Sequence, residues 1–287
     1  MIMVMEAIIL EQELDVVNEF RNIYPKRVSV LRRYKEANGE DFRWETVTNS
    51  KLYYFVEYLK NNVSTNSART YAAMLKSFIN LFLPKFKGIN AGWEKILSIR
   101  EVETTSITLD EVEVDKIIKY ALDNSNGETN VAVASTFAIC CITGTRWDDA
   151  YKLKDIDLSG HTFKYISDKT DIIAEIPVSP VLRQLVGLVK KFSLAHYNRT
   201  IRSICGELKI NSDVTIFKGG VALRGAKYEF VSSHTARRSF ATNLYKRGAD
   251  LEIISKMMGH ATYEQTKRYI NSDLDNLDDN IKSFFNR

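Results

Sequence analysis

Apolar residues recur every three to four positions through much of the first hundred residues. Residues 51–61 and 65–82 both show this spacing, with charged side chains off the stripe, and Pro84 closes the second stretch. Such spacing predicts amphipathic helices that bury one face. A further helix is expected over residues 11–22. The two stripes consist of Leu52, Phe55, Val56 and Leu59, and of Ala68, Tyr71, Ala72, Leu75, Phe78, Ile79 and Phe82.

The helical pattern is interrupted over residues 98–105, which are polar and lack periodic apolar positions. A polar stretch of this kind between two periodic segments predicts a linker. We therefore expect two domains, residues 1–103 and residues 104–287.

Two sequence patterns predict where helices begin in the second domain. Thr108 and Glu111 have the T-x-x-E spacing of a capping box, in which a side chain at each end satisfies a free backbone N–H. Thr262 and Gln265 have the related T-x-x-Q spacing. The second box is expected to open a helix that carries Tyr269.

The period of the pattern changes in the middle of the second domain. An apolar helix is expected over residues 131–142, ended by Gly144. Residues 161–166 and 172–178 then read as two short strands joined by a turn at residues 167–171. Helices resume after the second strand. The expected fold class is therefore mainly α with one small antiparallel β-sheet, an α+β arrangement in two domains.

Helical spacing returns near the C terminus. Residues 234–246 read as a helix with Gly248 past its end, and residues 251–258 as another that Gly259 stops. A terminal helix is expected from an apolar stripe of Leu274, Leu277, Ile281, Phe284 and Phe285.

Composition agrees with an ordinary globular protein. The chain has 287 residues, of which 45% are hydrophobic and 26% charged, so each of two domains can bury a core. The formal net charge of +4 is only mildly basic. Bulk charge therefore does not establish nucleic-acid binding.

The cysteines and the N terminus indicate in which cellular compartment the protein is expected. Cys140, Cys141 and Cys205 lack metal-ligand spacing, and two of them are adjacent, so we expect reduced, mostly buried thiols and no metal. Residues 1–10 lack the basic start and cleavage site of a signal peptide, and no apolar run reaches the length of a membrane span. A soluble, intracellular protein without membrane contact is expected.

His234 and Arg237 are three residues apart on a predicted helix, so they lie on one face. The planar donors of a guanidinium match phosphate oxygens. Taken alone, the pair fits a surface arginine beside a partly buried histidine better. His260 and Tyr269 are nine residues apart, with a helix stop between them that could bring the side chains together. Each could equally be structural.

Arg146 follows a glycine where a new segment begins, a place that favours anions, and Asp149 could orient its side chain. An exposed Arg–Asp pair is the alternative, and such pairs contribute little stability. Lys169 lies in the predicted hairpin turn. There it is either solvated or able to deliver a proton to a bound molecule.

Four segments in order resemble the active-site boxes of the tyrosine recombinases, the phage integrase family. They are G-T-R-W-D-D-A-Y-K-L from residue 144, S-D-K-T from residue 167, H-T-A-R-R-S-F-A-T from residue 234, and M-M-G-H-A-T-Y-E-Q-T-K-R-Y-I from residue 257. The resemblance extends over residues 107–270. It implies a helical core-binding domain at residues 1–103 and a tyrosine recombinase catalytic domain at residues 104–287.

The resemblance implies a nucleophile and a set of cations around it. Tyr269 would attack the scissile phosphate, giving a 3′-phosphotyrosine link and a free 5′-hydroxyl, with no metal or other cofactor. Arg146 and Arg237 would clamp the non-bridging oxygens, where charge develops. Asp149 would support Arg146.

The remaining family positions concern protons. Lys169 would protonate the leaving 5′-oxygen, with Lys164 on the preceding strand as the alternative. His234 would accept the proton of the tyrosine, and His260 would hydrogen-bond a phosphate oxygen.

The resemblance also implies partners. Double-stranded DNA would be held in a two-domain clamp, by a homo-tetramer on paired DNA sites that is a monomer or weak dimer in free solution. The protein would act in the cytoplasm, either at the nucleoid or, if it is viral, in the cytoplasm of a host cell. It could also belong to a mobile element. Possible phosphate contacts, which could equally be solubility charges, are Arg27, Arg32, Arg33, Arg69, Lys76 and Arg238.

Each end of the chain supports a further expectation. The apolar terminal stripe could pack on its own domain or on a neighbouring protomer, and the sequence does not separate the two. Only about 30 residues precede the basic cluster, too few for the additional N-terminal domain of many phage integrases.

We expect a site-specific recombinase that performs integration, excision, inversion or resolution. A type IB topoisomerase-like relaxing activity shares the same nucleophile chemistry. A catalytically silent DNA-binding protein of the same fold is a third hypothesis, although every expected position carries the expected residue type.

Overall fold

The computed structural model describes residues 16–102, 104–167 and 172–270. The chain divides into two compact units, Met1–Thr104 with Phe217–Val221, and Thr105–Ile216 with Ala222–Arg287. Each unit has its own hydrophobic core. The roles expected of residues 1–103 and 104–287 stay predictions.

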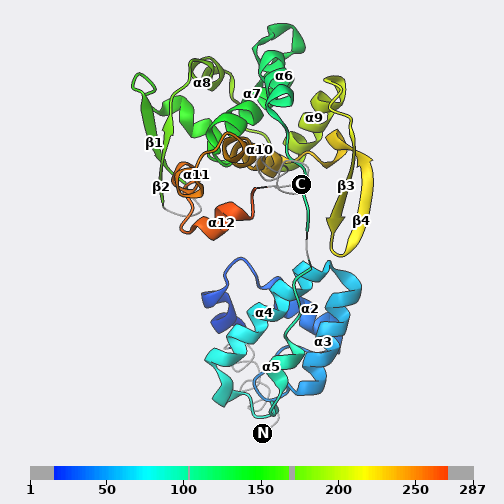
Figure 1. The fold of residues 1–287 in the computed structure, drawn as a ribbon. Helices are drawn as coiled ribbons and strands as arrows, with labels where there is room; N and C mark the ends of the chain where they lie inside the picture. Colours follow the sequence, from blue (N-terminus) through cyan, green and yellow to red (C-terminus); the bar gives the residue numbers. More distant parts are fainter. Residues whose placement is uncertain (1–15, 103, 168–171, 271–287) are drawn as a thin grey trace, which may run out of the picture. The chain divides into compact units, whose positions relative to one another are not determined.

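The first unit is helical (Figure 1). Both predicted stripes face the core, with Tyr71 and Phe82 only partly buried. Each helix begins at a hydroxyl cap, where Thr48 accepts a hydrogen bond from the Lys51 N–H and Ser64 one from the Ser67 N–H. The core is rich in aromatic rings, with Trp44 stacked on Phe78 at a centroid distance of 5.7 Å. The elements of the first unit are a helix over residues 16–23, α2 (Ser29–Asn38), α3 (Asn49–Asn62), α4 (Thr65–Leu81), η1 (Leu83–Lys85) and α5 (Trp93–Ile96).

The second unit is built around α7 (Glu128–Thr143), whose side chains are nearly all buried. Figure 1 shows α7 and α10 in the middle of this unit, with β1 and β2 beside α11. The helices are α6 (Glu111–Leu122), α8 (Pro180–Leu185), α9 (Leu194–Glu207), α10 (Ser233–Lys246), α11 (Leu251–Met258) and α12 (Tyr263–Lys267), with 3-10 turns η2 (Asn124–Asn126), η3 (Ala150–Asp155), η4 (Val186–Leu188) and η5 (Lys227–Phe230).

The predicted pairing of two strands is confirmed, and residues 168–171 of the turn expected between them lie outside the described residues. β1 (Thr162–Ile166) pairs with β2 (Ile173–Pro177) in an antiparallel register that sets Thr162 opposite Pro177 and Ile166 opposite Ile173. Residues alternate between exposed and buried along both strands, as expected for a sheet with one solvated face.

One small sheet was expected, and the described residues contain two. β3 (Asp213–Lys218) pairs with β4 (Val221–Ala226). The turn between them is Gly219–Gly220, with φ angles of 61° and 83°. Two glycines can adopt positive φ without strain, and the tight turns that suit the twist of a hairpin need it. The Gly-Gly pair was therefore a hairpin signal that the expectation of continuous helices overlooked.

Both predicted capping boxes are wrong. The cap of α6 is Asp110, whose carboxylate accepts from the Glu113 N–H while the Glu113 carboxylate accepts from the Asp110 N–H. The side chain of Thr262 makes no capping bond to α12, and the Gln265 N–H instead reaches the Thr262 carbonyl oxygen at 3.1 Å. The helix expected to carry Tyr269 is also shorter than predicted, because α12 ends at Lys267.

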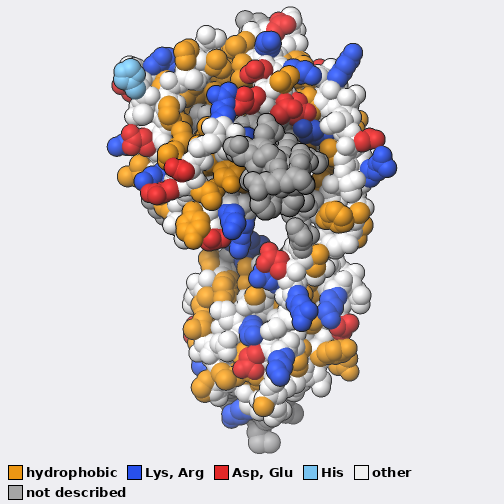
Figure 2. Space-filling model, in the orientation of Figure 1, with side chains coloured by type: hydrophobic (Ala, Val, Ile, Leu, Met, Phe, Trp, Pro, Cys, Tyr) orange, Lys and Arg blue, Asp and Glu red, His pale blue; other side chains and the backbone are white. Residues whose placement is uncertain are grey.

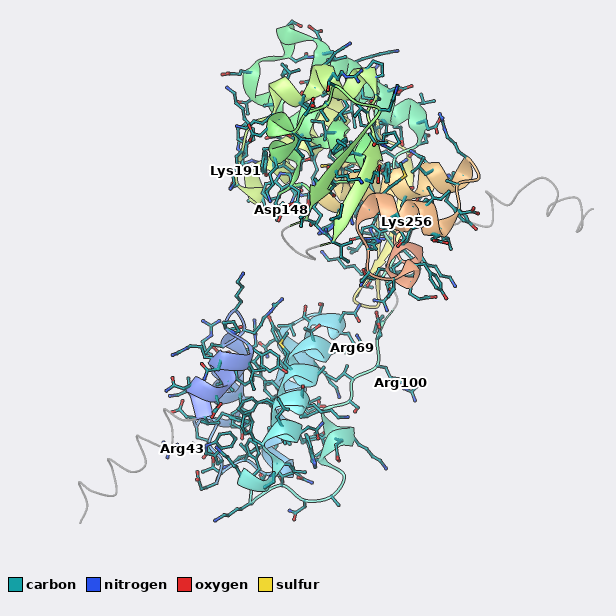
Figure 3. The ribbon with its side chains drawn as sticks, turned by 90° about the vertical axis from the view of Figure 1, so that its left-hand side faces the viewer. Arg43, Arg69, Arg100, Asp148, Lys191 and Lys256 are labelled. Atoms are coloured by element: carbon teal, nitrogen blue, oxygen red, sulfur yellow. The ribbon has the colours of Figure 1, made fainter. Side chains whose placement is uncertain are left out.

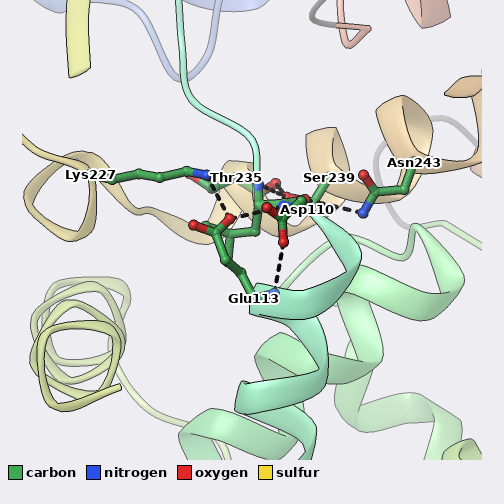
Figure 4. A network of polar contacts seen from close by, with 7 residues as sticks. Asp110, Glu113, Lys227, Thr235, Ser239 and Asn243 are labelled. Carbon is green, nitrogen blue, oxygen red and sulfur yellow. Dashed lines mark hydrogen bonds and ion pairs between the residues drawn. The ribbon is translucent and has the colours of Figure 1, made fainter. Parts of the chain in front are cut away.

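The segment before α6 is fastened to α10 by a polar network (Figure 4). The Ser239 hydroxyl accepts a hydrogen bond from the Leu109 N–H at 2.8 Å and donates to the Thr235 carbonyl oxygen, and the Asn243 amide donates to the Leu109 carbonyl oxygen. Lys227 forms an ion pair with Glu113 at 2.6 Å. The bonds from Leu109 to Ser239 and Asn243 connect residues more than a hundred positions apart and attach α10 to the segment before α6.

Replacing Ser239 with alanine is expected to destabilise the fold by ~1–3 kcal/mol, because the buried Leu109 N–H would lose its acceptor. Chemical denaturation of Ser239→Ala beside Ser125→Ala, a polar residue outside this network, measures the difference. Equal stabilities of the two variants would contradict the importance of the network.

The three cysteines are buried and unbridged, as expected. Burial raises the pKa of Cys140 and of Cys205 to about 12, so both thiols are protonated at neutral pH. Among the described residues, none of the helices has the length and apolar character needed to cross a bilayer. The expected terminal helix at residues 274–285 and the first residues of the helix expected over 11–22 lie outside the described residues.

Candidate active site

The site begins where α7 ends. Gly144 caps this helix in the left-handed region, with φ of 69°. A Cβ atom at this position would lie 2.5 Å from the Phe240 ring, so only glycine lets the two segments approach this closely. The chain turns sharply here, and Arg146 follows two residues later.

Arg146 is held by a hydroxyl relay. Its Nη1 donates to the Ser167 Oγ at 2.5 Å, and the Ser167 hydroxyl donates to the Asp149 Oδ2 at 2.7 Å. Ser167 and Asp149 are almost fully buried. Asp149 thus supports Arg146 as expected, but through a serine at the end of β1. Sequence reasoning missed Ser167, because nothing local distinguishes it from a turn residue.

For the DNA-cleaving activity that the resemblance implies, replacing Ser167 with alanine is expected to lower the cleavage rate about 10-fold or more, the size typical of groups that orient a reactive side chain from behind. The reason is that Arg146 would lose its link to Asp149. Single-turnover cleavage measures the effect. Ser135→Ala is the matched control, since Ser135 is equally buried in α7, and cleavage by Ser167→Ala at the rate of this control would contradict the relay.

Arg237 joins the ends of two helices. Its Nη1 donates to the carbonyl oxygen of Gly144, the cap of α7, and its Nη2 donates to the carbonyl oxygen of Met258, the last residue of α11, at 2.5 Å. Helix C termini leave carbonyl groups unpaired and carry partial negative charge. These two ends therefore offset part of the cost of burying a guanidinium that is only 1% exposed.

The hydrogen bonds that Arg237 makes to the two helix ends and to His260 do not engage every N–H of its guanidinium. Its Nε–H is buried and makes no hydrogen bond to the described residues, and the Tyr165 side chain is near enough to interact with the guanidinium. Burial and the nearby charge of Arg146 both lower the pKa of Arg237 below its usual value. The two arginines are thus close enough to repel each other, an arrangement that an anion between them would stabilise.

His260 lies against Arg237, just past the end of α11. Its Nε2 is 2.9 Å from the Arg237 Nη2, and its Nδ1 is 2.9 Å from the Thr266 Oγ1. Burial, followed by the charges of Arg237 and Arg146, lowers the pKa of His260 to about 4. The imidazole is therefore neutral at neutral pH.

Tyr269 completes the cluster from the turn after α12. Its ring centroid is 5.2 Å from that of His260, 5.7 Å from the Arg237 Cζ and 5.1 Å from the Arg238 Cζ. The ring is half-buried. The structure thus brings Arg237, His260 and Tyr269 into direct contact, with Arg146 close enough to act on the pKa values of two of them.

Other predicted site residues are less closely tied to this cluster. Lys169 lies outside the described residues. The alternative, Lys164, is exposed on β1 and pairs with Glu175 at 3.4 Å. His234 is exposed in the first turn of α10, one turn before Arg237. Arg238 was expected to face DNA or solvent, but its guanidinium lies over the Tyr269 ring and donates to the Arg268 carbonyl oxygen.

The expected phosphate contacts of the first unit are mostly engaged within it. Arg32 pairs with Glu36, Arg69 pairs with Glu101, and Lys76 donates to the Glu94 carbonyl oxygen and the Ser98 hydroxyl. These residues therefore have structural partners as well as charge.

The two other residues of this unit that were expected to contact phosphate differ in exposure. Arg33 lies over the Tyr71 ring, and Arg27 is exposed. In Figure 3, Arg69 and Arg100 lie on one side of this unit and Arg43 on the other. Figure 2 shows basic and acidic side chains interspersed on the visible face of each unit. On this visible face, charge alone does not single out a DNA-binding surface.

Comparisons with known proteins point to one family. The model of the phage integrase family matches residues 108–275. Over 233 residues the chain is 24% identical to the integrase of Escherichia phage 186, an alignment that covers 79% of this chain and 63% of that protein, less than two thirds of its length. It is 26% identical over 263 residues to the tyrosine recombinase XerC of Natranaerobius thermophilus, covering 86% of this chain and 85% of that protein.

Solved structures agree on the fold. The Tn1549 transposon integrase in complex with transposon right end DNA superposes with a TM-score of 0.65 at 13% identity, covering 94% of this chain and 99% of that chain. A lambda integrase dimer bound to a COC′ core site gives a TM-score of 0.63 at 13% identity, covering 90% of this chain and 94% of that chain. The expected fold class is thereby confirmed, with a second small sheet.

Proposed function

This chain belongs to the phage integrase family, the tyrosine recombinases, and from this premise we propose that it cuts and rejoins DNA at specific sites through a 3′-phosphotyrosine link to Tyr269. The observation that carries the proposal is the contact of the Tyr269 ring with Arg237, a cation, and with His260, a hydrogen-bonding group. Both residues come from other segments of the chain.

The arginines suit the demand of the reaction. Negative charge on the phosphoryl oxygens has to be met by fixed donors in the transition state. Arg237 is held by two helix ends and Arg146 by a serine–aspartate relay, so both are placed before DNA binds. Preorganised donors of this kind need no costly rearrangement during the reaction.

The proposed bond changes are those that the family resemblance implies for these residues. The Tyr269 oxygen attacks phosphorus, and the bond from phosphorus to the 5′-oxygen breaks. Lys169 gives a proton to that leaving oxygen, and His234 takes the proton of the phenol. Attack by a 5′-hydroxyl from a second DNA end reverses these steps and completes strand exchange. The ester keeps the bond energy, so no external energy source enters.

We assign the first unit to DNA contact, together with the second, and expect tetramers on paired DNA sites. The structures of the Tn1549 and lambda integrases, both bound to DNA, support DNA as the partner. Salt-dependent binding through Arg27, Arg33 or Arg238 fits this assignment, with Arg32, Arg69 and Lys76 as further contacts once their present partners are exchanged.

Trapping a covalent intermediate tests the proposal. The protein is incubated with duplexes that carry a randomised central segment, the mixture is denatured, and DNA that stays bound to protein is sequenced. We expect one recurring sequence and a nucleotide remnant on the peptide containing Tyr269, identified by mass spectrometry. Recovery of DNA only under native conditions would point to a silent DNA-binding protein, and relaxation of plasmids lacking the recovered site would point to a topoisomerase.

A further inference from the structure

Thr266 touches both proposed reacting partners of the phosphate. It lies in α12 and is fully buried. Its hydroxyl oxygen is 2.9 Å from the His260 Nδ1, and its carbonyl oxygen accepts the Tyr269 N–H at 2.8 Å. A single residue therefore ties the imidazole ring to the backbone that carries the phenol.

The contacts of His260 fix the position of its proton. The Arg237 Nη2 can only donate, so the His260 Nε2 beside it must accept. A neutral imidazole then carries its proton on Nδ1, which donates to the Thr266 Oγ1. The lowered pKa of His260, caused by burial and by Arg237 and Arg146, agrees with a neutral ring.

We propose that Thr266 is a positioning residue of the strand-cleavage reaction, whose hydroxyl holds His260 with Nε2 directed at the phosphate site. The inference rests on the proposed function. Its physical basis is that a buried Nδ1–H without a partner is costly, so the ring would turn or shift if the hydroxyl were absent.

A hydroxyl suits this position better than an obligate acceptor. A phosphate oxygen beside Nε2 can only accept, so the imidazole must then carry a proton on Nε2. The Thr266 hydroxyl can donate to a bare Nδ1 or accept from a protonated one. The contact between Thr266 and His260 therefore survives whichever ring nitrogen of His260 carries the proton.

The test separates the hydroxyl from the shape of the side chain. Thr266→Val removes only the hydroxyl and keeps the carbonyl that binds the Tyr269 N–H, whereas Thr266→Ser keeps the hydroxyl. Thr136→Val is the matched control, because Thr136 is an equally buried threonine in α7 that bonds a backbone carbonyl. Single-turnover cleavage, DNA affinity and nitrogen-15 NMR of the histidine rings are measured, with His260→Gln to assign the His260 signals.

We expect wild type and Thr266→Ser to show His260 protonated on Nδ1 in the free protein. Thr266→Val should shift the His260 signals and slow cleavage about 10-fold or more, a typical effect of removing an orienting partner. DNA affinity should stay within about twofold of wild type, since such a partner acts through the reacting group and leaves the binding surface unchanged. Thr266→Ser should recover most of the lost rate.

The inference would be overturned by a wild-type His260 protonated on Nε2 in the free protein, or by Thr266→Val with the signals and cleavage rate of Thr136→Val. Equal defects in Thr266→Ser and Thr266→Val would also overturn it, because they would assign the effect to shape. Failure of the proposed function would show differently, as a wild-type protein that forms no covalent adduct, and the NMR signals would still decide whether the hydroxyl orients His260.

Discussion

Tyr269→Phe is expected to abolish covalent DNA cleavage, with a loss on the order of 10⁵–10⁶-fold, the scale seen when a nucleophile is removed. Only the phenol oxygen disappears. The contacts with His260, Arg237 and Arg238 are made by the ring, and the backbone bond to Thr266 does not involve the side chain. Thermal stability and DNA affinity should therefore match wild type, which circular dichroism and gel-shift titration can establish beside the cleavage assay.

Tyr263→Phe is the matched control for this variant. Tyr263 is an exposed tyrosine in α12, so its phenol should be dispensable. A covalent adduct in Tyr269→Phe that maps to another tyrosine would assign the nucleophile elsewhere.

Arg237→Lys is expected to lower the cleavage rate ~10³-fold or more, as when an arginine that stabilises phosphoryl-transfer charge is removed. The substitution keeps the positive charge, so charge alone cannot explain a loss. A lysine offers one nitrogen in place of a rigid fork, and it cannot reach the Gly144 carbonyl, the Met258 carbonyl and a phosphate oxygen together. Single-turnover cleavage at saturating protein separates this loss from weaker binding.

The same variant should also be less stable. A carbonyl left unpaired in the interior costs ~1–3 kcal/mol, so the free energy of unfolding should fall by that amount or more. Arg202→Lys serves as the control, because Arg202 also donates to a backbone carbonyl, that of Val231, but outside the cluster. Wild-type cleavage by Arg237→Lys would contradict a bidentate role for this arginine.

The convergence of the site was largely predictable from sequence, because short motifs specify residue types at fixed spacing. Arg237, His260 and Tyr269 come together as the boxes imply. Gly144 and Gly259 mark two helix ends correctly, since left-handed caps favour glycine for steric reasons.

The residues behind the site were not predictable. Ser167 and Thr266 act through single hydroxyls whose partners are decided by tertiary packing. A serine after a strand or a threonine in a helix has many equivalent uses, so no local pattern identifies them. The position of Tyr269 beyond α12 was also missed, because a T-x-x-Q spacing marks where a helix can begin and does not determine where it ends.

The attachment of Arg237 to two helix ends affects how copies of this gene would decay once selection for recombination is lifted. A change at position 237 removes bonds that the fold itself needs, whereas a change at the half-buried position 269 leaves the interior intact. Lineages that still require a folded DNA-binding protein should therefore lose the phenol long before the guanidinium. Relics of the enzyme would be recognised by an intact arginine facing a missing tyrosine.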